Sequence, residues 1–404
     1  MIFLFDKTET YSYDRLLKEV NERDSYFPLL QTSKIFDYFV NFVKALVCNQ
    51  SIILIDSDMN PSEIESIDSC QINVPIKIGT KSIASMNDVI KAVMDSTSEI
   101  TLFTSGTTGQ PKKVIHTVST LTRYVRTGDK YKGQIWAYAY NPTHMAGIQV
   151  FFQAFANQNT LVNVFNQSRD EVYQQIENKG ITHISATPTF YRLLLPYEKS
   201  FSSVIRVTFG GEKSDHHLYE SIQRIFPNAK INNVYASTEA GSLFAAKGDA
   251  FQIPATIKNL IKVVDDELLI HKSLLGTSDS FHYDDDFYHS GDLIEWINQE
   301  DGLFKFKSRK NELINVGGYK VNPGEVENVI LDIDGIKQAY VYGKANSILG
   351  NVLCADVVLQ ENTIVKELDI RQRLEKTLQS FKIPRRIKFV ERIELTRTGK
   401  QKRK

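Results

Sequence analysis

A stretch rich in hydroxyls and glycine near residue 105 has the residue types that bind phosphate. It spans residues 103–114 and follows Glu99–Phe103, whose apolar alternation predicts a strand. Gly106 and Gly109 let the backbone turn tightly and approach a ligand closely, and successive N–H groups in such a turn form an anion-binding concavity. The expected phosphate-binding residues are Thr104, Ser105, Gly106, Thr107, Thr108, Gly109 and Lys112.

This stretch is not a Walker A loop, which requires four residues between its glycines and then Lys followed by Ser or Thr. Taken by itself, it is more typical of a polar surface loop between two strands. Other nucleotide-binding residues must therefore accompany it before it can be interpreted as a phosphate site.

The composition indicates a globular protein with no global charge preference. A length of 404 residues suggests two or three domains of roughly 150 residues each. The 48 basic and 48 acidic residues cancel, so no net field indicates a nucleic-acid partner. Residues 366–404, however, carry 14 Lys/Arg against 5 Asp/Glu, which fits either a solvated surface or an anionic partner.

The cysteine count and the absence of long apolar runs indicate a cytoplasmic protein. Three irregularly spaced cysteines argue for a reducing compartment and against a disulfide or zinc framework. Met1–Phe5 is too short for the apolar region of a signal peptide and has no basic leader. No run reaches the 18 apolar residues of a membrane span, so we expect none.

Helical and strand periodicities alternate along the first two thirds of the chain. Leu16, Leu17 and Val20 have helical spacing, the apolar residues of 35–47 repeat at three and four, and Ser51–Asp56 is typical of a short buried strand. The alternation continues to about residue 230. It predicts an α/β fold in which sheets are covered by helices.

Several of these strands are expected to end in polar or glycine-rich turns, where ligands bind in open α/β sheets. A strand at 136–140 leads to His144 before a helix, and Tyr288–Asp292 is another phosphate-type candidate. The strands at 204–209 and 230–234 precede the turns Gly210–Glu212 and Tyr235–Glu239.

From residue 311 the pattern changes to a small α+β unit of about 95 residues, a normal domain size. It is expected to begin with a hairpin whose turn contains Gly317 and Gly318, followed by a helix with Pro323 in its first turn. We expect two domains, 1–308 and 309–404, with a boundary near residues 308–311.

The order of these motifs closely resembles that of the adenylate-forming superfamily, which contains acyl- and aryl-CoA ligases, stand-alone adenylation domains and luciferases. The resemblance covers most of the chain from about residue 100, and more loosely residues 35–56. It implies a large N-terminal domain of mixed sheets covered by helices and a small mobile α+β C-terminal domain. The matching stretches are 103–112, 210–212, 235–239, 290–292, Arg309 with 317–320 and 323–327, and 398–400.

The resemblance implies an ATP site. The loop from Thr104 to Lys112 would cradle the β- and γ-phosphates, Tyr235 would stack on the adenine, and Asn233 would bond its amino group. Asp292, helped by Arg309, would accept both ribose hydroxyls. Other expected nucleotide-binding residues are Gly210, Gly211 and Glu212 beside the adenine, Ala236 and Ser237.

The same resemblance implies catalytic groups and a metal. Thr238 would donate to the α-phosphate, and Glu239 would hold Mg²⁺, which prefers carboxylate, phosphate and water oxygens. His144 matches the position that closes the acyl pocket near the reacting carboxylate. Lys400 matches the invariant C-terminal lysine, which would stabilise the negative charge that develops during adenylation.

The implied reaction has two halves. A carboxylate attacks the α-phosphorus of ATP and releases pyrophosphate, and a thiol then attacks the acyl-adenylate. In the family the small domain rotates between these steps, so that the backbone of Gly317 and Gly318 lines the thiol tunnel in the second. Coenzyme A is the expected thiol, and the phosphopantetheine arm of an acyl carrier protein is the alternative.

Some positions depart from the family pattern. Asn311 stands where the hinge is usually Asp or Lys, Lys113 and Ala236 replace usual glycines, and Glu394 stands where proline is common. The region before the phosphate loop is shorter than in most relatives, which suggests a shallower pocket or a partner that fills the gap.

The leading interpretation is an acid–thiol ligase that forms an acyl- or aryl-CoA, and a stand-alone adenylation enzyme is the second. A non-catalytic AMP-binding protein is disfavoured, since Lys400, Glu239 and Asp292 are all present. No acidic residue precedes Tyr235 at the amino-group position, and Asp215 is only loosely placed, so we expect a neutral aryl or short-to-medium acyl acid. The candidate pocket residues are His144, Met145, Gly147, Ala186, Thr187, Phe209 and the region of Ser237.

Overall fold

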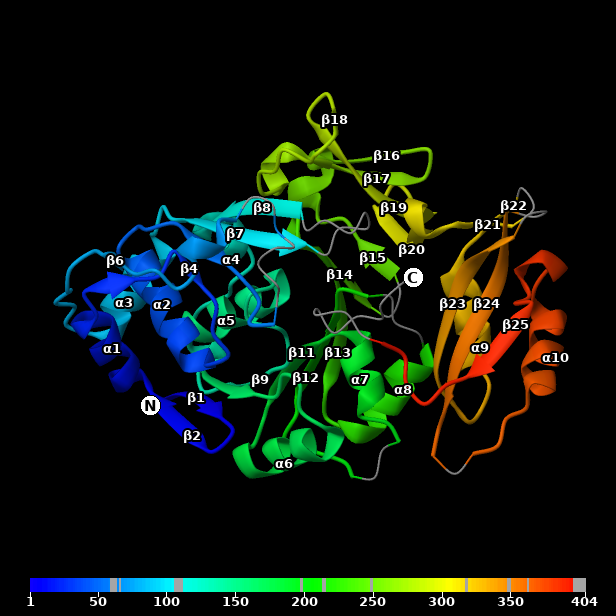
Figure 1. Cartoon of the computed structure of the whole chain (residues 1–404), viewed down its shortest axis with the longest axis horizontal. Coiled ribbons are helices and arrows are strands. Elements are labelled where there is room, and N and C mark those ends of the chain that lie inside the picture. Colours follow the sequence, from blue (N-terminus) through cyan, green and yellow to red (C-terminus); the bar gives the residue numbers. More distant parts are fainter. Residues whose placement is uncertain are drawn as a thin grey trace.

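The structure, a computed structural model, describes residues 1–58, 64, 67–104, 112–196, 199–212, 216–247, 250–316, 319–346, 350–361 and 363–394. A large mixed sheet and a smaller sheet form most of the molecule, and a five-stranded sheet forms the C-terminal part (Figure 1). Helices pack against these sheets. The α/β fold with a small α+β C-terminal unit is therefore confirmed.

Parallel strands form one half of the large sheet. β12 pairs in parallel with β11 and β13, and β9 pairs in parallel with β10 and β11. β1 joins β10 in parallel, and β2 closes that edge. The strands are β1 (Ile2–Asp6), β2 (Glu9–Ser12), β9 (Ile135–Tyr138), β10 (Thr160–Asn163), β11 (His183–Ala186), β12 (Arg206–Gly210) and β13 (Lys230–Ser237).

Helices cover these strands through two separate apolar cores. One core contains buried residues of α1 to α5, and the other contains those of α6, α7 and α8. In α2, 12 of 13 residues are buried, which is typical of a core helix. The helices are α1 (Tyr13–Glu22), α2 (Ile35–Val47), α3 (Met86–Met94), α4 (Val118–Thr122), α5 (Met145–Phe155), α6 (Arg169–Lys179), α7 (Pro188–Leu193) and α8 (His216–Ile225).

The other half of the large sheet is antiparallel, and its core is rich in phenylalanine. The strands are β14 (Gly241–Lys247), β15 (Ala250–Gln252), β16 (Ile261–Val264), β17 (Glu267–His271), β18 (Tyr283–Asp284), β19 (Phe287–Asn298) and β20 (Leu303–Arg309).

Two turns expected from the sequence belong to strands. The strand expected at 230–234 continues to Ser237, because β14 folds back on it with Ser237 opposite Gly241. Tyr288–Asp292 lies inside β19, because β17 and β20 pair with that strand. Long-range pairing thus overrides the local preference of glycine and serine for turns.

The smaller sheet carries the expected phosphate loop. Its order is β4-β5-β7-β8, in which the first three strands are parallel and β8 returns antiparallel to β7. A separate pair is formed by β3 (Ser25–Tyr26) and β6 (Ile76–Lys77). The strands are β4 (Leu29–Leu30), β5 (Ile52–Leu54), β7 (Glu99–Thr104) and β8 (Lys112–Thr117).

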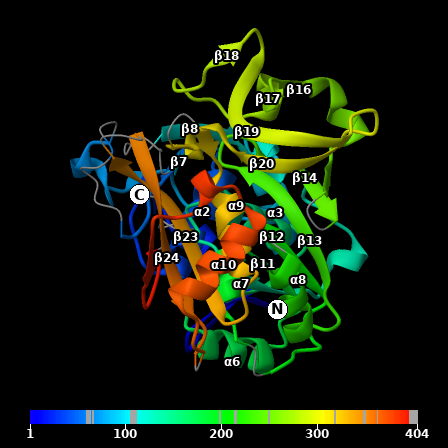
Figure 2. The same cartoon turned by 90° about the vertical axis from the view of Figure 1, so that its right-hand side faces the viewer.

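The C-terminal unit is best seen from the side in Figure 2. Its elements are β21 (Ile314–Val316), β22 (Tyr319–Val321), α9 (Pro323–Leu331), β23 (Ile336–Asn346), β24 (Gly350–Leu359), α10 (Glu367–Thr377) and β25 (Arg386–Phe389). Asn322 caps α9, and Pro323 lies in its first turn as predicted. A single 3₁₀ turn, Lys310–Glu312, separates β20 from β21; the domain boundary and the hinge at Asn311 stay predictions.

None of the helices in the described parts of the chain is long and apolar enough to cross a membrane.

Candidate active site

The hairpin of β7 and β8 brings the two ends of the expected phosphate loop together. Thr104 lies opposite Lys112 in the strand register, and the side chains of Lys112 and Lys113 are exposed. The loop residues themselves, Ser105, Gly106, Thr107, Thr108 and Gly109, lie outside the described residues.

The turn after β13, Thr238–Ala240, is fixed from two sides. His116 of β8 donates from Nε2 to the carbonyl oxygen of Thr238 at 2.8 Å. The backbone N–H of Gly276 donates to the carbonyl oxygen of Glu239 at 2.8 Å. The expected α-phosphate donor is therefore attached to β8, the strand that follows the phosphate loop, and the expected metal ligand is attached to Gly276.

His116 is a residue that sequence reasoning missed. Burial lowers its pKa from 6.5 to about 4, so the ring is neutral at pH 7. Since Nε2 faces a carbonyl oxygen, Nε2 carries the proton and Nδ1 accepts from the hydroxyl of Thr120 at 3.2 Å. The one available signal was a histidine at an inward position of an alternating strand, which does not by itself indicate a site.

Asp292 forms a cluster with two other predicted nucleotide-binding residues. The Tyr235 hydroxyl donates to Asp292 Oδ2 at 2.6 Å, and Arg309 Nε donates to Oδ1 at 2.9 Å. The Asp292 side chain is only 7% exposed. Each carboxylate oxygen has two acceptor sites, so both can still accept a further hydrogen bond.

Electrostatics keeps the two donors of this cluster, Arg309 and Tyr235, protonated. The negative charge of Asp292 raises the pKa of Arg309 and so keeps the guanidinium charged. Burial and then Asp292 raise the pKa of Tyr235 well above 10, so its hydroxyl stays a donor. The charge of Glu239 also acts on both residues, which places the turn after β13 within electrostatic reach of the cluster.

The Tyr235 ring already has aromatic neighbours. It lies nearly parallel to Phe244 and Phe306, with centroids 5.4 and 4.7 Å away. Its hydroxyl contact with Asp292 was not predicted. Asn233, expected to bond the adenine, is a buried residue of β13, and a register shift separates Tyr235 from Ala236 at the end of that strand.

The Gly210–Glu212 turn also has a structural role. Gly210 ends β12, and Gly211 adopts a φ of 82°, which favours glycine. Glu212 Oε2 accepts from the N–H and the hydroxyl of Thr189 at 3.0 and 2.7 Å. Glu212 therefore holds the start of α7, and its contact with adenine stays a prediction.

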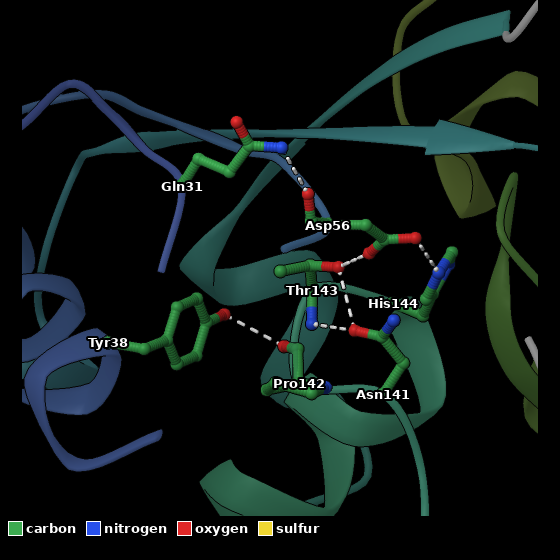
Figure 3. Close-up of polar contacts among 7 residues, drawn as sticks. All are labelled: Gln31, Tyr38, Asp56, Asn141, Pro142, Thr143 and His144. Carbon is green, nitrogen blue, oxygen red and sulfur yellow. Dashed lines mark hydrogen bonds and ion pairs between the residues drawn. The ribbon is translucent and has the colours of Figure 1, made fainter. Parts of the chain in front are cut away.

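His144 is the residue that immediately precedes α5, in the segment that follows β9 (Figure 3). Its Nε2 is 3.0 Å from Oδ2 of the buried Asp56, and the Thr143 hydroxyl donates to Asp56 Oδ1. Tyr38 donates to the carbonyl oxygen of Pro142 at 2.8 Å. Asp56 was not predicted as a site residue, since it stood only as the last residue of an expected strand.

A buried carboxylate connects the start of the C-terminal unit to β19. Glu267 accepts from Gly291 N–H at 3.0 Å, His289 Nδ1 at 3.1 Å and Lys310 Nζ at 3.2 Å. Burial works to raise the pKa of Glu267, but these hydrogen bonds outweigh it and lower the pKa overall. Glu267 thus fixes the backbone beside Asp292 and contacts the residue before Asn311.

A divalent cation at this site would need oxygen atoms from a substrate. Among the described residues, no group of three or more His, Cys, Asp or Glu side chains could hold a metal ion. Glu239 is a partly exposed carboxylate in the turn beside β8. A single carboxylate fits Mg²⁺, which usually binds one or two carboxylates, substrate phosphates and water.

Three other predicted site residues lie outside the described residues: Lys400, Gly317 and Gly318. Asp215 also lies outside them. Their roles stay predictions.

The chain belongs to the AMP-binding enzyme family. Residues 41–269 match that family, and residues 325–400 match the AMP-binding enzyme C-terminal domain. This confirms the resemblance inferred from the ordered motifs. The turn after β13 lies within the first matched range, and the roles of the Asp292 cluster stay predictions.

The curated relatives differ greatly in length. Gramicidin S synthase 2 of Aneurinibacillus migulanus is 27% identical over 350 residues, which cover 75% of this chain and 8% of that synthase. The 2-succinylbenzoate–CoA ligase of Listeria monocytogenes is 27% identical over 325 residues, which cover 75% of this chain and 68% of that ligase.

Solved structures show the same fold at low identity. ATP-bound MatB from Rhodopseudomonas palustris has a TM-score of 0.75 and 16% identity, with 99% of this chain and 94% of that one covered. The o-succinylbenzoate coenzyme A synthetase of Bacillus subtilis, in complex with ATP and magnesium ion, has a TM-score of 0.69 and 18% identity, covering 99% and 95%.

Proposed function

We propose that this protein activates a carboxylic acid with ATP and then transfers the acyl group to coenzyme A. In the first half-reaction a carboxylate oxygen attacks the α-phosphorus of ATP, and pyrophosphate leaves. In the second the thiol attacks the acyl carbonyl carbon, and AMP leaves. The acid is expected to be a neutral aryl or short-to-medium acyl acid.

The observation that carries this proposal is the Asp292 cluster. A nearly buried carboxylate held by Arg309 and Tyr235 is a fixed acceptor for two hydroxyls, as a ribose requires. The turn with Thr238 and Glu239 lies within electrostatic reach and is attached to β8. ATP would thus have its ribose at β19 and its phosphates at the β7–β8 hairpin.

The residues present would hold Mg²⁺ through Glu239 and the phosphates of ATP. When bound, the ion would neutralise phosphate charge as the carboxylate approaches. Lys400 would add a second positive charge at the reacting phosphorus. Two similar proteins support this assignment. One is the 2-succinylbenzoate–CoA ligase of Listeria monocytogenes, and the other is the Bacillus subtilis synthetase in complex with ATP and magnesium ion.

The proposal is tested by carboxylate-dependent ATP–pyrophosphate exchange over a broad panel of acids. Lys400→Ala should lower exchange about a hundredfold or more, as expected when a charge that stabilises the transition state is removed. Lys402→Ala, two residues away, is the matched control and should keep exchange within twofold. An absence of exchange with every acid would favour a non-catalytic AMP-binding protein.

A second function is loading of an acyl carrier protein by a stand-alone adenylation enzyme. The identity to gramicidin S synthase 2 favours this alternative, whereas the basic surplus of residues 366–404 fits both acceptors. Thioester formation with coenzyme A should be compared with formation on a phosphopantetheinylated carrier. A clear preference for the carrier would reject coenzyme A as the acceptor.

A further inference from the structure

Asp56 joins two parts of the fold that are far apart in the sequence. It follows β5 and is 2% exposed, and its Oδ2 lies 3.0 Å from His144 Nε2 (Figure 3). The Thr143 hydroxyl donates to the other carboxylate oxygen, and Gln31 Nε2 donates to the Asp56 carbonyl oxygen at 2.9 Å. The segment before α5 is thereby bound to the smaller sheet.

The position of Asp56 relates it to both substrates. β5 lies parallel beside β7, and the carboxyl ends of parallel strands meet at the same edge of a sheet. Asp56, which follows β5, therefore lies at the sheet edge where β7 ends and the expected phosphate loop begins. The helix after His144 lies beside the turn that contains Glu239. A Cβ at Gly241, directly after that turn, would meet Gln149 Nε2 at 2.8 Å and Met145 Sδ at 3.7 Å, so the first turns of α5 pack there.

The hydrogen bond between Asp56 and His144 decides which ring nitrogen can meet a substrate. A carboxylate accepts only, so Nε2 must carry the proton in this contact. Nδ1 has no hydrogen-bond partner among the described residues, and the His144 side chain is 17% exposed. A ring held through one nitrogen by a buried carboxylate has a fixed orientation.

We propose that Asp56 is a positioning residue for His144, which rests on the proposed function. By holding Nε2, Asp56 fixes the orientation of the imidazole, so that the opposite edge of the ring closes the acyl pocket beside the nucleotide site. Asp56 then affects the binding of the acid through His144 and leaves the binding of ATP unchanged.

A purely structural role for Asp56 makes a different prediction. If Asp56 only held the segment before α5, Thr143→Val would have the same effect as Asp56→Ala, since the Thr143 hydroxyl makes the other contact with this carboxylate. The amide of Asp56→Asn can still accept from Nε2–H. Gln31→Met is the control, because it removes a contact with the Asp56 backbone.

The experiment measures acid and ATP KM values in pyrophosphate exchange. Asp56→Ala should raise the KM for the acid about tenfold, as expected for a lost hydrogen bond to a charged group, and should leave the KM for ATP within twofold. Asp56→Asn, Thr143→Val and Gln31→Met should all stay within about threefold of the wild type. Equal increases in Asp56→Ala and Thr143→Val, or in Asp56→Ala and Asp56→Asn, would overturn the positioning role.

A double-mutant cycle tests whether Asp56 acts through His144. In a His144→Gln background, Asp56→Ala should add nothing to the KM for the acid, and a further tenfold increase would contradict the proposal. If the wild type shows no acid-dependent exchange, the proposed function fails by itself.

The ring contact can be tested without activity by NMR of ¹⁵N-histidine-labelled protein. The His144 signal is the one absent from His144→Gln. In the wild type its nitrogen shifts should report a proton on Nε2, and Asp56→Ala should change them while Gln31→Met does not. An unchanged His144 signal in Asp56→Ala would overturn the inference whatever the enzyme does.

Discussion

His116 Nε2 and the carbonyl oxygen of Thr238 lie 2.8 Å apart, although 122 positions separate the two residues in the sequence. The contact joins the strand that follows the phosphate loop to the turn expected to hold the α-phosphate and the metal. It requires a proton on Nε2, and burial lowers the pKa of His116 so that the ring is otherwise neutral at pH 7.

The first prediction concerns the pH dependence of stability. Burial lowers the pKa of His116 from 6.5 to about 4, so between these values the unfolded chain binds more protons than the folded chain. Stability must therefore fall as the pH falls from 7 toward 4. His116 alone should account for roughly 2 kcal/mol between pH 7 and pH 5.

The measurement is thermal unfolding at pH 5, 6 and 7 in the wild type and in His116→Gln, which can still donate to Thr238. The variant should lose less stability on acidification. His183→Gln is the control, because burial also lowers the pKa of His183 to about 4 on a different strand; it should flatten the pH profile without changing nucleotide binding. An identical pH profile for wild type and His116→Gln would refute the assignment.

The second prediction concerns the Tyr235 hydroxyl. Tyr235→Phe keeps the ring and its packing on Phe244 and Phe306 but removes a donor to Asp292. The KM for ATP should rise about fivefold, and Asp292→Asn should raise it about tenfold or more, because hydrogen bonds to a charged group are stronger than neutral ones.

Tyr288→Phe is the matched control for this prediction. Tyr288 senses the charge of Asp292, yet no hydrogen bond between the two is found among the described residues. The KM for ATP should therefore stay within twofold. A Tyr288→Phe effect as large as that of Tyr235→Phe would mean that the hydroxyl contact has no specific role.

The third prediction concerns Gly276, which leaves no space for a side chain. A Cβ there would lie 2.6 Å from the Ile115 carbonyl oxygen and 2.8 Å from His116 Nε2. Gly276→Ala should destabilise the protein by about 1–3 kcal/mol, as overpacking does, and should weaken nucleotide binding through His116. Gly324→Ala, whose Cβ would meet only Asn322 Oδ1 at 3.3 Å, should leave the unfolding midpoint nearly unchanged. Equal midpoints for the two variants would count against the crowding.

The fourth prediction compares how much Glu267 and its partner Lys310 contribute to the free energy of unfolding. Glu267→Ala leaves the Gly291 N–H without its acceptor and should cost about 1–3 kcal/mol. Lys310→Ala removes only a partner whose side chain is 64% exposed and should cost less than about 1 kcal/mol. Denaturant unfolding distinguishes the two, and equal losses would show that Gly291 does not depend on Glu267.

The fourth prediction also has a pH dependence, which comes from the Glu267 carboxylate, whereas that of the first prediction comes from the His116 imidazole. Because the pKa of folded Glu267 is lowered from 4.5, its stabilisation is present above pH 4.5 and is lost as the pH falls through the lower folded value. Glu267→Gln should therefore show a smaller loss of stability below pH 4.5 than the wild type. A loss equal to that of the wild type would mean that this carboxylate is not the titrating group.

Much of the fold could be predicted because its elements follow local rules. The helix of 35–47 was indicated by apolar spacing alone, and Pro323 marked the first turn of α9. The residues expected to bind the nucleotide were inferred from the order of motifs, in which each residue type suits phosphate, ribose or metal. The errors occurred where pairing with distant strands decided the outcome, as for Ser237 and for Ser290–Asp292.

The sequence by itself determined the family, the α/β architecture and the residues expected to meet ATP, since these depend on residue type, order and short spacing. Only the tertiary structure decided that His116 holds Thr238, that Asp56 holds His144 and that Glu267 joins Gly291 to Lys310. These contacts join residues 24 to 122 positions apart. They depend on strand register and on burial, which local periodicity does not encode.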